Sequence, residues 1–387
     1  MIKIGVLTTT RAEYGLMRQL LFKLNKDPDF ELKLLVSGTH LSHNYGYTID
    51  EIKADNLPIA STFDILFEKN GVINPSLTMA KTIEVFTEYF SNNKLDLLFV
   101  DGDRYETLAV CIAAVNNNIP IAHCGGGATT EGSNDEIWRH AITKMSYLHF
   151  VTCDLYKKRI ICMGEDPSRV FVSGSPGIDN IRVMELGTKS QLEKRINKHL
   201  DKPYALVTFH PVIMEDSSFE QQISEILNVC SKIDDMMFIF TMANADQGGS
   251  LINEKLLEFC KKHSNSVCVS SLGAFYYLTA MKYCEFVMGN SSSGLIEAPS
   301  LKIPTVNIGD RQKGRLKAKS IIDCKTISSD IYRAILIARS TEFKCLCKNA
   351  INPYGDGFAS DVIISKIKDV FGKGLFSLKK NFYDYKE

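Results

Sequence analysis

Uninterrupted apolar runs alternate with helical patterns along the first half of the chain. The runs fall at 3–8, 32–36, 95–100, 119–122, 149–152 and 170–173. Helical spacing of apolar residues fills 14–24, 77–92, 108–115 and a stretch ending near residue 163. Strands that are apolar at every position are buried on both faces, as in a parallel sheet covered by helices. The first half is therefore predicted to be a doubly wound α/β domain.

The same alternation restarts after the polar stretch SGSPGIDN at 173–180. Strands are predicted at 204–209, 237–241, 267–270, 284–288 and 305–308, and helices at 190–199, 219–232, 251–262 and 278–282. We therefore predict two Rossmann-like domains, at 1–178 and 179–358, with a cleft between them at the carboxyl ends of the strands. A helix and tail at 359–387 are expected to pack back toward the first domain.

Charge and cysteine content argue against a nucleic-acid-binding surface and against a metal site. The 387 residues include 45 basic and 45 acidic ones, and this balance argues against a broad nucleic-acid surface. The 11 cysteines show no metal-ligand spacing, so we expect reduced thiols, no metal and a cytoplasmic protein. The start of the chain lacks a signal-peptide pattern, and no apolar stretch approaches the roughly 18 residues of a membrane span.

The stretch 287–315 contains a predicted phosphate site. A turn of Gly, Asn and three Ser at 289–293 opens a predicted helix at 294–298, where backbone N–H groups would face a ligand. Glu297 follows one turn later, at a distance suited to a sugar hydroxyl. Arg311 and Arg315 offer counter-charge for an anion. The same pattern also fits an ordinary strand–turn–helix with a solvated basic loop.

Two carboxylates follow the strand at 95–100. Asp101 and Asp103 flank Gly102, and either could act as a base or orient one if the pocket raises its pKa. The alternative is that Asp103 caps the helix that contains Glu106.

The loop 123–140 combines a glycine run with acid–base groups. Glycine allows the backbone to approach a ligand closely. Glu131, Asp135, Glu136, Arg139 and two histidines are candidates in this loop. Taken singly, each of them also fits a structural role, and Asp135 also fits a helix N-cap.

Two further clusters follow predicted strands. The segment 8–14, TTTRAEY, places hydroxyls and Arg11 at a helix entrance, which suits an anion or a capped helix equally well. His210 ends the first strand of the second half, where a histidine can bind phosphate or transfer protons. Asn244 and Asp246 follow the next strand and are candidates for holding a ribose or sugar.

These segments together resemble the hydrolysing nucleotide-sugar 2-epimerases, which include the UDP-N-acetylglucosamine 2-epimerases of bacterial sialic acid synthesis and their relatives for legionaminic acid. The resemblance rests on RAEYG (11–15), SGTHLS (37–42), VDGDRYE (100–106), DEIWRHAITKMSYLHF (135–150), SGSPGIDN (173–180), TFHPV (208–212), GNSSSGLIEAPS (289–300), NIGDRQKGR (307–315) and NPYGDG (352–357). It implies a glycosyltransferase-B-like fold, a homodimer and no cofactor. The implied reaction is elimination of UDP to a 2-acetamidoglycal, followed by addition of water to give N-acetylmannosamine.

The resemblance also assigns residues. Asp103, Asp135 and His210 match positions linked to catalysis. Matches to nucleotide contacts are Arg11, Arg104, Ser291, Ser292, Glu297 and Arg311, and we add Asn244 and Arg315 from the pattern above.

The glycine loop departs from the family pattern, His-x-(Glu or His)-Gly-Gly-Glu. Gly125 and Ala128 occupy the two positions that usually carry ionisable side chains. Our hypothesis is an active enzyme in which Glu131, three residues further on, compensates.

Several alternatives stay open at this point. The substrate is UDP-N-acetylglucosamine or a UDP- or GDP-linked 2,4-diacetamido-2,4,6-trideoxy sugar, whose contacts we expect in the region 41–76. A glycosyltransferase of the same fold, or a nucleotide-sugar-binding protein without catalysis, are the other classes.

Overall fold

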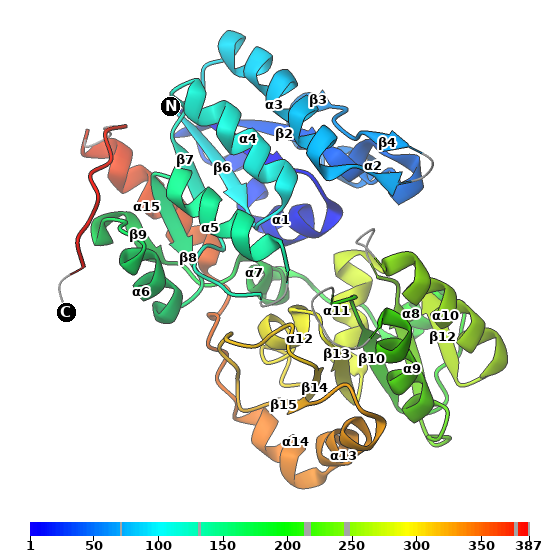
Figure 1. Ribbon diagram of the computed structural model, residues 1–387. Helices are drawn as coiled ribbons and strands as arrows, with labels where there is room; N and C mark the ends of the chain where they lie inside the picture. Colours follow the sequence, from blue (N-terminus) through cyan, green and yellow to red (C-terminus); the bar gives the residue numbers. More distant parts are fainter. Residues whose placement is uncertain (70–71, 131–132, 213–217, 244–247, 375–377, 386–387) are drawn as a thin grey trace. The chain divides into compact units, whose positions relative to one another are not determined.

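Two parallel sheets organise the chain, and each belongs to its own structural unit (Figure 1). The computed structural model describes residues 1–69, 72–130, 133–212, 218–243, 248–374 and 378–385. Unit 1 consists of Met1–Ala128, Asn134–Asn180 and Tyr354–Glu387, and unit 2 of Thr129–Ser133 and Ile181–Pro353. The predicted fold class, two doubly wound parallel α/β domains, is confirmed.

Unit 1 contains a seven-stranded parallel sheet with the strand order β3-β2-β1-β6-β7-β8-β9. Its strands are β1 (Ile2–Thr8), β2 (Phe30–Ser37), β3 (Ile59–Phe63), β6 (Leu97–Asp101), β7 (Ile121–Cys124), β8 (Leu148–Val151) and β9 (Val170–Val172). A separate antiparallel pair is formed by β4 (Glu68–Lys69) and β5 (Val72–Ile73). The helices are α1 (Arg11–Lys26), α2 (Ile49–Ala54), α3 (Pro75–Asn92), α4 (Tyr105–Asn116), α5 (Asp135–Met145), α6 (Asp154–Cys162), α7 (Pro176–Val183) and α15 (Ala359–Gly372).

Unit 2 contains a six-stranded parallel sheet with the order β12-β11-β10-β13-β14-β15. Its strands are β10 (Tyr204–Thr208), β11 (Met237–Thr241), β12 (Ser266–Val269), β13 (Phe286–Gly289), β14 (Thr305–Ile308) and β15 (Ile321–Cys324). Its helices are α8 (Lys189–Ile196), α9 (Phe219–Cys230), α10 (Gly249–Lys262), α11 (Gly273–Tyr283), α12 (Ser293–Ile296), α13 (Ser328–Arg339) and α14 (Thr341–Lys348).

Consecutive residues of the central strands pack into different cores. On β2, Leu34 and Leu35 belong to separate clusters on the two sides of the sheet, and both are fully buried. Leu206 and Val207 of β10 are divided in the same way in unit 2. This two-sided burial explains why the strands are apolar at every position.

The last helix, α15, belongs to unit 1 (Figure 1, orange-red). Its Ile363 and Ile367 are fully buried in the core that contains β1 and α1. At its start, both carboxylate oxygens of Asp179 accept backbone N–H groups, from Ala359 at 2.9 Å and Ser360 at 2.7 Å. This cap satisfies two of the donors that a helix N-terminus leaves open.

The sequence patterns did not predict α2, β3, the β4–β5 pair, α5, α7, β15, α13 and α14. The missed strands β3 and β15 lie at sheet edges and have alternating or partial burial. They therefore lack the continuous apolar signal of the central strands. None of the helices in the described ranges is long and apolar enough to cross a membrane.

Candidate active site

A buried arginine holds the carboxylate that follows β6. Arg139 of α5 is 1% exposed and forms an ion pair with Asp103. Its Nη1 also donates to the carbonyl of Ala128 at 3.0 Å and to Glu136 Oε2 at 2.8 Å. A guanidinium partner stabilises the ionised form of a carboxylate. The arrangement therefore presents Asp103, which is partly exposed, as an oriented carboxylate and a candidate base.

Neither of the two predicted carboxylates is a helix cap. The N-cap of α4 is Arg104, and the N-cap of α5 is Asn134. Asp135 is the first residue of α5 and is half-buried. The capping alternatives for Asp103 and Asp135 are therefore wrong, which leaves both carboxylates as candidates for chemistry.

His123 supports the turn between Asp101 and Asp103. Its ring is fully buried, and Nε2 lies 2.8 Å from the carbonyl oxygen of Gly102. A carbonyl only accepts, so Nε2 carries the proton, and Nδ1 accepts from the hydroxyl of Thr143 at 3.2 Å. Burial lowers the pKa of His123 to about 3. The ring is therefore neutral at pH 7 and acts as a fixed donor.

The hydroxyl cluster after β1 forms a helix cap. Thr10 is the N-cap of α1 and forms a capping box with Glu13. One oxygen of Glu13 also accepts from the N–H and hydroxyl of Thr9, at 2.8 and 2.9 Å. Burial raises the pKa of Glu13 to about 7. Arg11 is half-buried on the first turn of this helix, and burial lowers its pKa.

Arg104 is engaged within unit 1. Its Nε and Nη2 donate to the two carboxylate oxygens of Glu106, each at 3.1 Å. The side chain of Glu106 is fully buried, so it holds the guanidinium in a defined position while Arg104 stays partly exposed. These two hydrogen bonds make Arg104 a preorganised cation of the kind that binds anionic groups.

Asn290 connects the segments that follow β10 and β13 in unit 2. It accepts the N–H of His210 at 2.7 Å and donates to the carbonyl of His210 at 2.8 Å. The carbonyl of Asn290 accepts from Gln312 Nε2 at 2.7 Å and from Arg311 Nη1 at 3.3 Å. The predicted candidates His210 and Arg311 therefore lie around one buried amide.

His210 is neutral in this environment. Burial and the neighbouring Arg311 lower its pKa to about 3. Its Nδ1 is buried and has no hydrogen-bond partner among the residues described. A neutral ring beside an arginine can hydrogen-bond an anionic ligand.

The serine turn after β13 differs from the prediction in one respect. The helix that follows is a single turn, α12. The predicted phosphate site needs the dipole of a helix, and one turn supplies little of it. The serines instead form a polar cluster, with Ser291 Oγ 3.1 Å and Tyr277 Oη 2.5 Å from Ser293 Oγ. Ser292 is the N-cap of α12. Any anion site here depends more on side chains than the sequence suggested.

Glu297 follows α12 and is a half-buried carboxyl. Burial raises its pKa to about 7. Glu297 in turn raises the pKa of the Tyr277 hydroxyl, after the larger effect of burial. A carboxyl of this kind can accept or donate a hydrogen bond to a hydroxyl at neutral pH.

The segment after the glycine loop packs against the basic loop of unit 2. Arg315 Nε donates to the carbonyl of Thr129 at 2.7 Å, and its Nη2 donates to the hydroxyl of Thr130 at 2.8 Å. Arg315 is thus bound to this segment while part of the residue stays exposed. Two predicted site residues, Glu131 and Asn244, lie outside the described residues.

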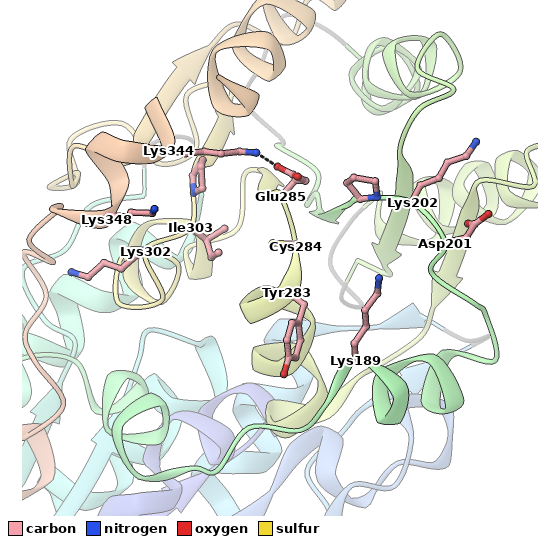
Figure 2. A pocket seen from close by; sticks show the side chains of 12 residues that line it. Lys189, Asp201, Lys202, Tyr283, Cys284, Glu285, Lys302, Ile303, Lys344 and Lys348 are labelled. Carbon is pink, nitrogen blue, oxygen red and sulfur yellow. Dashed lines mark hydrogen bonds and ion pairs between the residues drawn. The ribbon is translucent and has the colours of Figure 1, made fainter. Parts of the chain in front are cut away.

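A hollow of about 530 Å³ lies at the amino ends of the strands of the unit 2 sheet (Figure 2). Pro203, Glu285 and Pro304, which immediately precede β10, β13 and β14, line it. Five lysines also line it: Lys189, Lys202, Lys302, Lys344 and Lys348. Because all strands are parallel, this hollow is at the amino ends and is separate from the candidate site at the carboxyl ends.

Two features of this site were not predicted from the sequence. Arg139 stood out only as one polar group among several, because its partner Asp103 is 36 residues away. The hydrogen bond by which His123 holds Gly102 was not predicted either. Within the part of the chain that the structure describes, no group of three or more His, Cys, Asp or Glu is placed to hold a metal ion.

Comparisons with known proteins agree across the chain. A family model described as UDP-N-acetylglucosamine 2-epimerase matches residues 22–368. The chain is 40% identical to the polysialic acid biosynthesis protein P7 of Escherichia coli, covering 100% of this chain and 98% of the relative. It is 38% identical to the GDP/UDP-N,N′-diacetylbacillosamine 2-epimerase (hydrolyzing) of Campylobacter jejuni, covering 88% of each.

A solved structure has the same fold. The UDP co-structure of MnaA from S. aureus matches with a TM-score of 0.81 at 21% identity, covering 100% of both chains. The fold is therefore glycosyltransferase-B-like, as predicted.

Proposed function

The chain belongs to the UDP-N-acetylglucosamine 2-epimerase family, and from this premise we propose that it is a hydrolysing nucleotide-sugar 2-epimerase. The proposed substrate is UDP-N-acetylglucosamine, and the products are UDP and N-acetylmannosamine. The reaction passes through elimination to a 2-acetamidoglycal and addition of water.

Asp103 is the proposed base for the hydrogen at carbon 2. Its ion pair with Arg139 orients it, as a general base requires. Asp135 and Glu131 are the proposed groups that handle the water. Arg11 and Arg104 are the proposed cations of unit 1 that contact the substrate.

The leaving diphosphate needs its negative charge stabilised. We assign this to Arg311, Ser291, Ser292 and His210. The neutral His210 supplies a hydrogen bond in this proposal. Because Arg311 helps to lower the pKa of His210, an anion beside Arg311 would shift that pKa upward.

The nucleoside part is assigned to Glu297, Arg315 and Asn244. Glu297 is the proposed partner of a ribose hydroxyl, because its half-buried carboxyl, with a pKa raised to about 7, can serve as acceptor or donor near pH 7. Arg315 is the proposed organiser of the segment that contains Thr129 and Thr130.

The observation that carries the proposal is the Asp103–Arg139 pair at the end of β6 in a chain of this family. An NMR time course of the purified protein with UDP-N-acetylglucosamine tests it. Free UDP together with N-acetylmannosamine is the expected result. UDP-N-acetylmannosamine as product would contradict the hydrolysing reaction, and no turnover of any candidate substrate would contradict an enzyme.

A second substrate class is favoured by two relatives. The Campylobacter jejuni protein and a Legionella pneumophila relative, 33% identical, are both named as hydrolysing 2-epimerases of N,N′-diacetylbacillosamine nucleotides. The same time course with UDP- and GDP-linked 2,4-diacetamido-2,4,6-trideoxy sugars decides between the classes. The substrate with the higher kcat/KM is the one the protein uses.

A further inference from the structure

Asp101 is a buried carboxyl that the proposed reaction leaves without a role. It is the last residue of β6 and is 9% exposed. Its neighbour on β7 in the sheet register is Cys124, and the two side chains are hydrogen-bonded. Burial of an ionised carboxyl is costly unless it is paired and hydrogen-bonded, and otherwise the group shifts its pKa and becomes neutral.

Space lies next to the Asp101 carboxyl because residue 125 is glycine. A Cβ placed on Gly125 would lie 3.9 Å from Asp101 Oδ1 and 3.7 Å from the Gly102 nitrogen, which are ordinary contact distances. Gly125 has a φ of +87°, a conformation that favours glycine. A carbon-sized atom therefore fits beside Asp101 over the backbone of Gly125.

The two carboxyls that flank Gly102 have different surroundings. Asp103 is ion-paired with Arg139, whereas burial raises the pKa of Asp101 to about 7. The hydrogen bond to the Cys124 thiol lowers the pKa of Asp101, and the charge of Asp103 raises it. His123 of β7 is neutral, and Asp179 of α7 acts on the pKa of Cys124. Paired carboxyls with opposed environments are how one site supplies both an acid and a base.

We propose that Asp101 is the catalytic acid that gives a proton to carbon 2 of the 2-acetamidoglycal, with Asp103 as the base of the preceding step. The geometry behind this is a buried carboxyl two residues from Asp103 that opens onto the space left by Gly125. The inference rests on the proposed function, because it assigns a residue to one step of that reaction.

The two steps balance as follows. Asp103 takes hydrogen from carbon 2 as a proton, its electron pair forms the C1=C2 bond, and the bond from C1 to the diphosphate oxygen breaks with its pair on UDP. Asp101 then donates its proton to carbon 2, and a water oxygen bonds to C1. Asp135 takes the surplus proton of that water and passes it to solvent, from which Asp101 regains its own proton. Asp103 releases its proton to solvent, which is the proton set free by hydrolysis.

Asp101→Asn tests the assignment, because it removes the acidic proton but keeps the size of the side chain. We expect the variant to release UDP while the 2-acetamidoglycal accumulates in the NMR spectrum, and N-acetylmannosamine formation to fall at least about 100-fold. Asp101→Glu restores a carboxyl and is expected to recover part of this loss. Sugar formation by Asp101→Asn within threefold of wild type would overturn the proposal, as would a folded variant that releases no UDP.

A measurement on the unaltered protein covers the case in which the variant does not fold. The wild type is given UDP and synthetic 2-acetamidoglycal, and hydration to N-acetylmannosamine is followed from pH 6 to 9. The rate is expected to fall above about pH 7, as Asp101 loses its proton. A rate independent of pH across this range would overturn the proposal.

Different results would contradict the proposed function and the role of Asp101. If the wild type releases no UDP from any candidate substrate, the proposed function itself is wrong. If the wild type turns over and Asp101→Asn matches it, only the role of Asp101 is wrong.

Discussion

Arg139 is the residue on which the geometry of the unit 1 site depends. A guanidinium that is 1% exposed needs partners for its donors, and it finds them in Asp103, Glu136 and the Ala128 carbonyl. These partners come from the end of β6, from α5 itself and from the glycine loop. One buried cation thus fixes the loop relative to the candidate base.

Replacing Asp103 by Asn tests the base at this scale. Asparagine keeps an oxygen for Arg139 but cannot take a proton, so kcat should fall at least about 100-fold while KM stays within a few-fold. Asp234→Asn, at an exposed position of unit 2, is the matched control and should leave kcat unchanged. Steady-state UDP release measures both, and an Asp103→Asn kcat within threefold of wild type would exclude the assignment.

The sequence could point to Asp103 but not to the contacts that define it. Motif position placed Asp103 and His210 at strand ends, and the structure puts both there. The ion pair to Arg139 depends on how α5 packs against α4 and β7, which local sequence does not encode. Likewise, the burial that raises the pKa of Asp101 is a property of the packed sheet.

At the scale of elements, the close approach of β13 and β10 requires one glycine. Gly289 has a φ of +130°, and a Cβ there would lie 1.9 Å from the carbonyl oxygen of Thr208. Thr208 and Gly289 are partners in the parallel register. This contact aligns the two strand ends from which His210 and Asn290 continue.

Gly289→Ala is therefore expected to destabilise the protein by about 2 kcal/mol or more, since backbone must move. Gly372→Ala is the control, because no atom lies within 4 Å of its Cβ position at the end of α15. That substitution should be neutral or stabilise by up to about 1 kcal/mol. Urea unfolding compares them, and equal midpoints for the two variants would contradict the packing argument.

Element prediction succeeded where burial is two-sided and failed at the edges. Central strands such as β1 and β6 are continuous apolar runs, which one sequence reveals. In contrast, β3 alternates between half-buried and exposed residues before the buried Phe63, and the short α2 has no room for a periodic pattern. The helix predicted at 294–298 is observed as the single turn α12, which is too short to supply much of a helix dipole.

At the scale of the whole molecule, buried titratable groups link stability to pH. Burial raises the pKa of Glu13, Asp101 and Glu297 to about 7. A carboxyl whose pKa is higher in the folded protein favours folding below its unfolded pKa, and this contribution is lost as pH rises toward the folded value. The histidines with lowered pKa, His123 and His210, act oppositely and reduce stability as pH falls below about 6.5.

Glu297→Gln isolates one of these effects. Glutamine does not titrate, so the variant should gain free energy of unfolding relative to wild type as pH rises from 5 to 8, by about 1–3 kcal/mol. Exposed Glu254→Gln is the control and should show no such trend. Thermal melts across this range provide the measurement, and parallel pH profiles for wild type and Glu297→Gln would rule out a raised pKa.

The central claim is that the protein removes the hydrogen at carbon 2 and hydrolyses the nucleotide bond. The most direct test runs the reaction in D₂O and examines the released sugar by mass spectrometry and NMR. The account predicts N-acetylmannosamine with one deuterium at carbon 2, together with UDP. A released sugar that retains hydrogen at carbon 2, or that keeps the original configuration there, would contradict it.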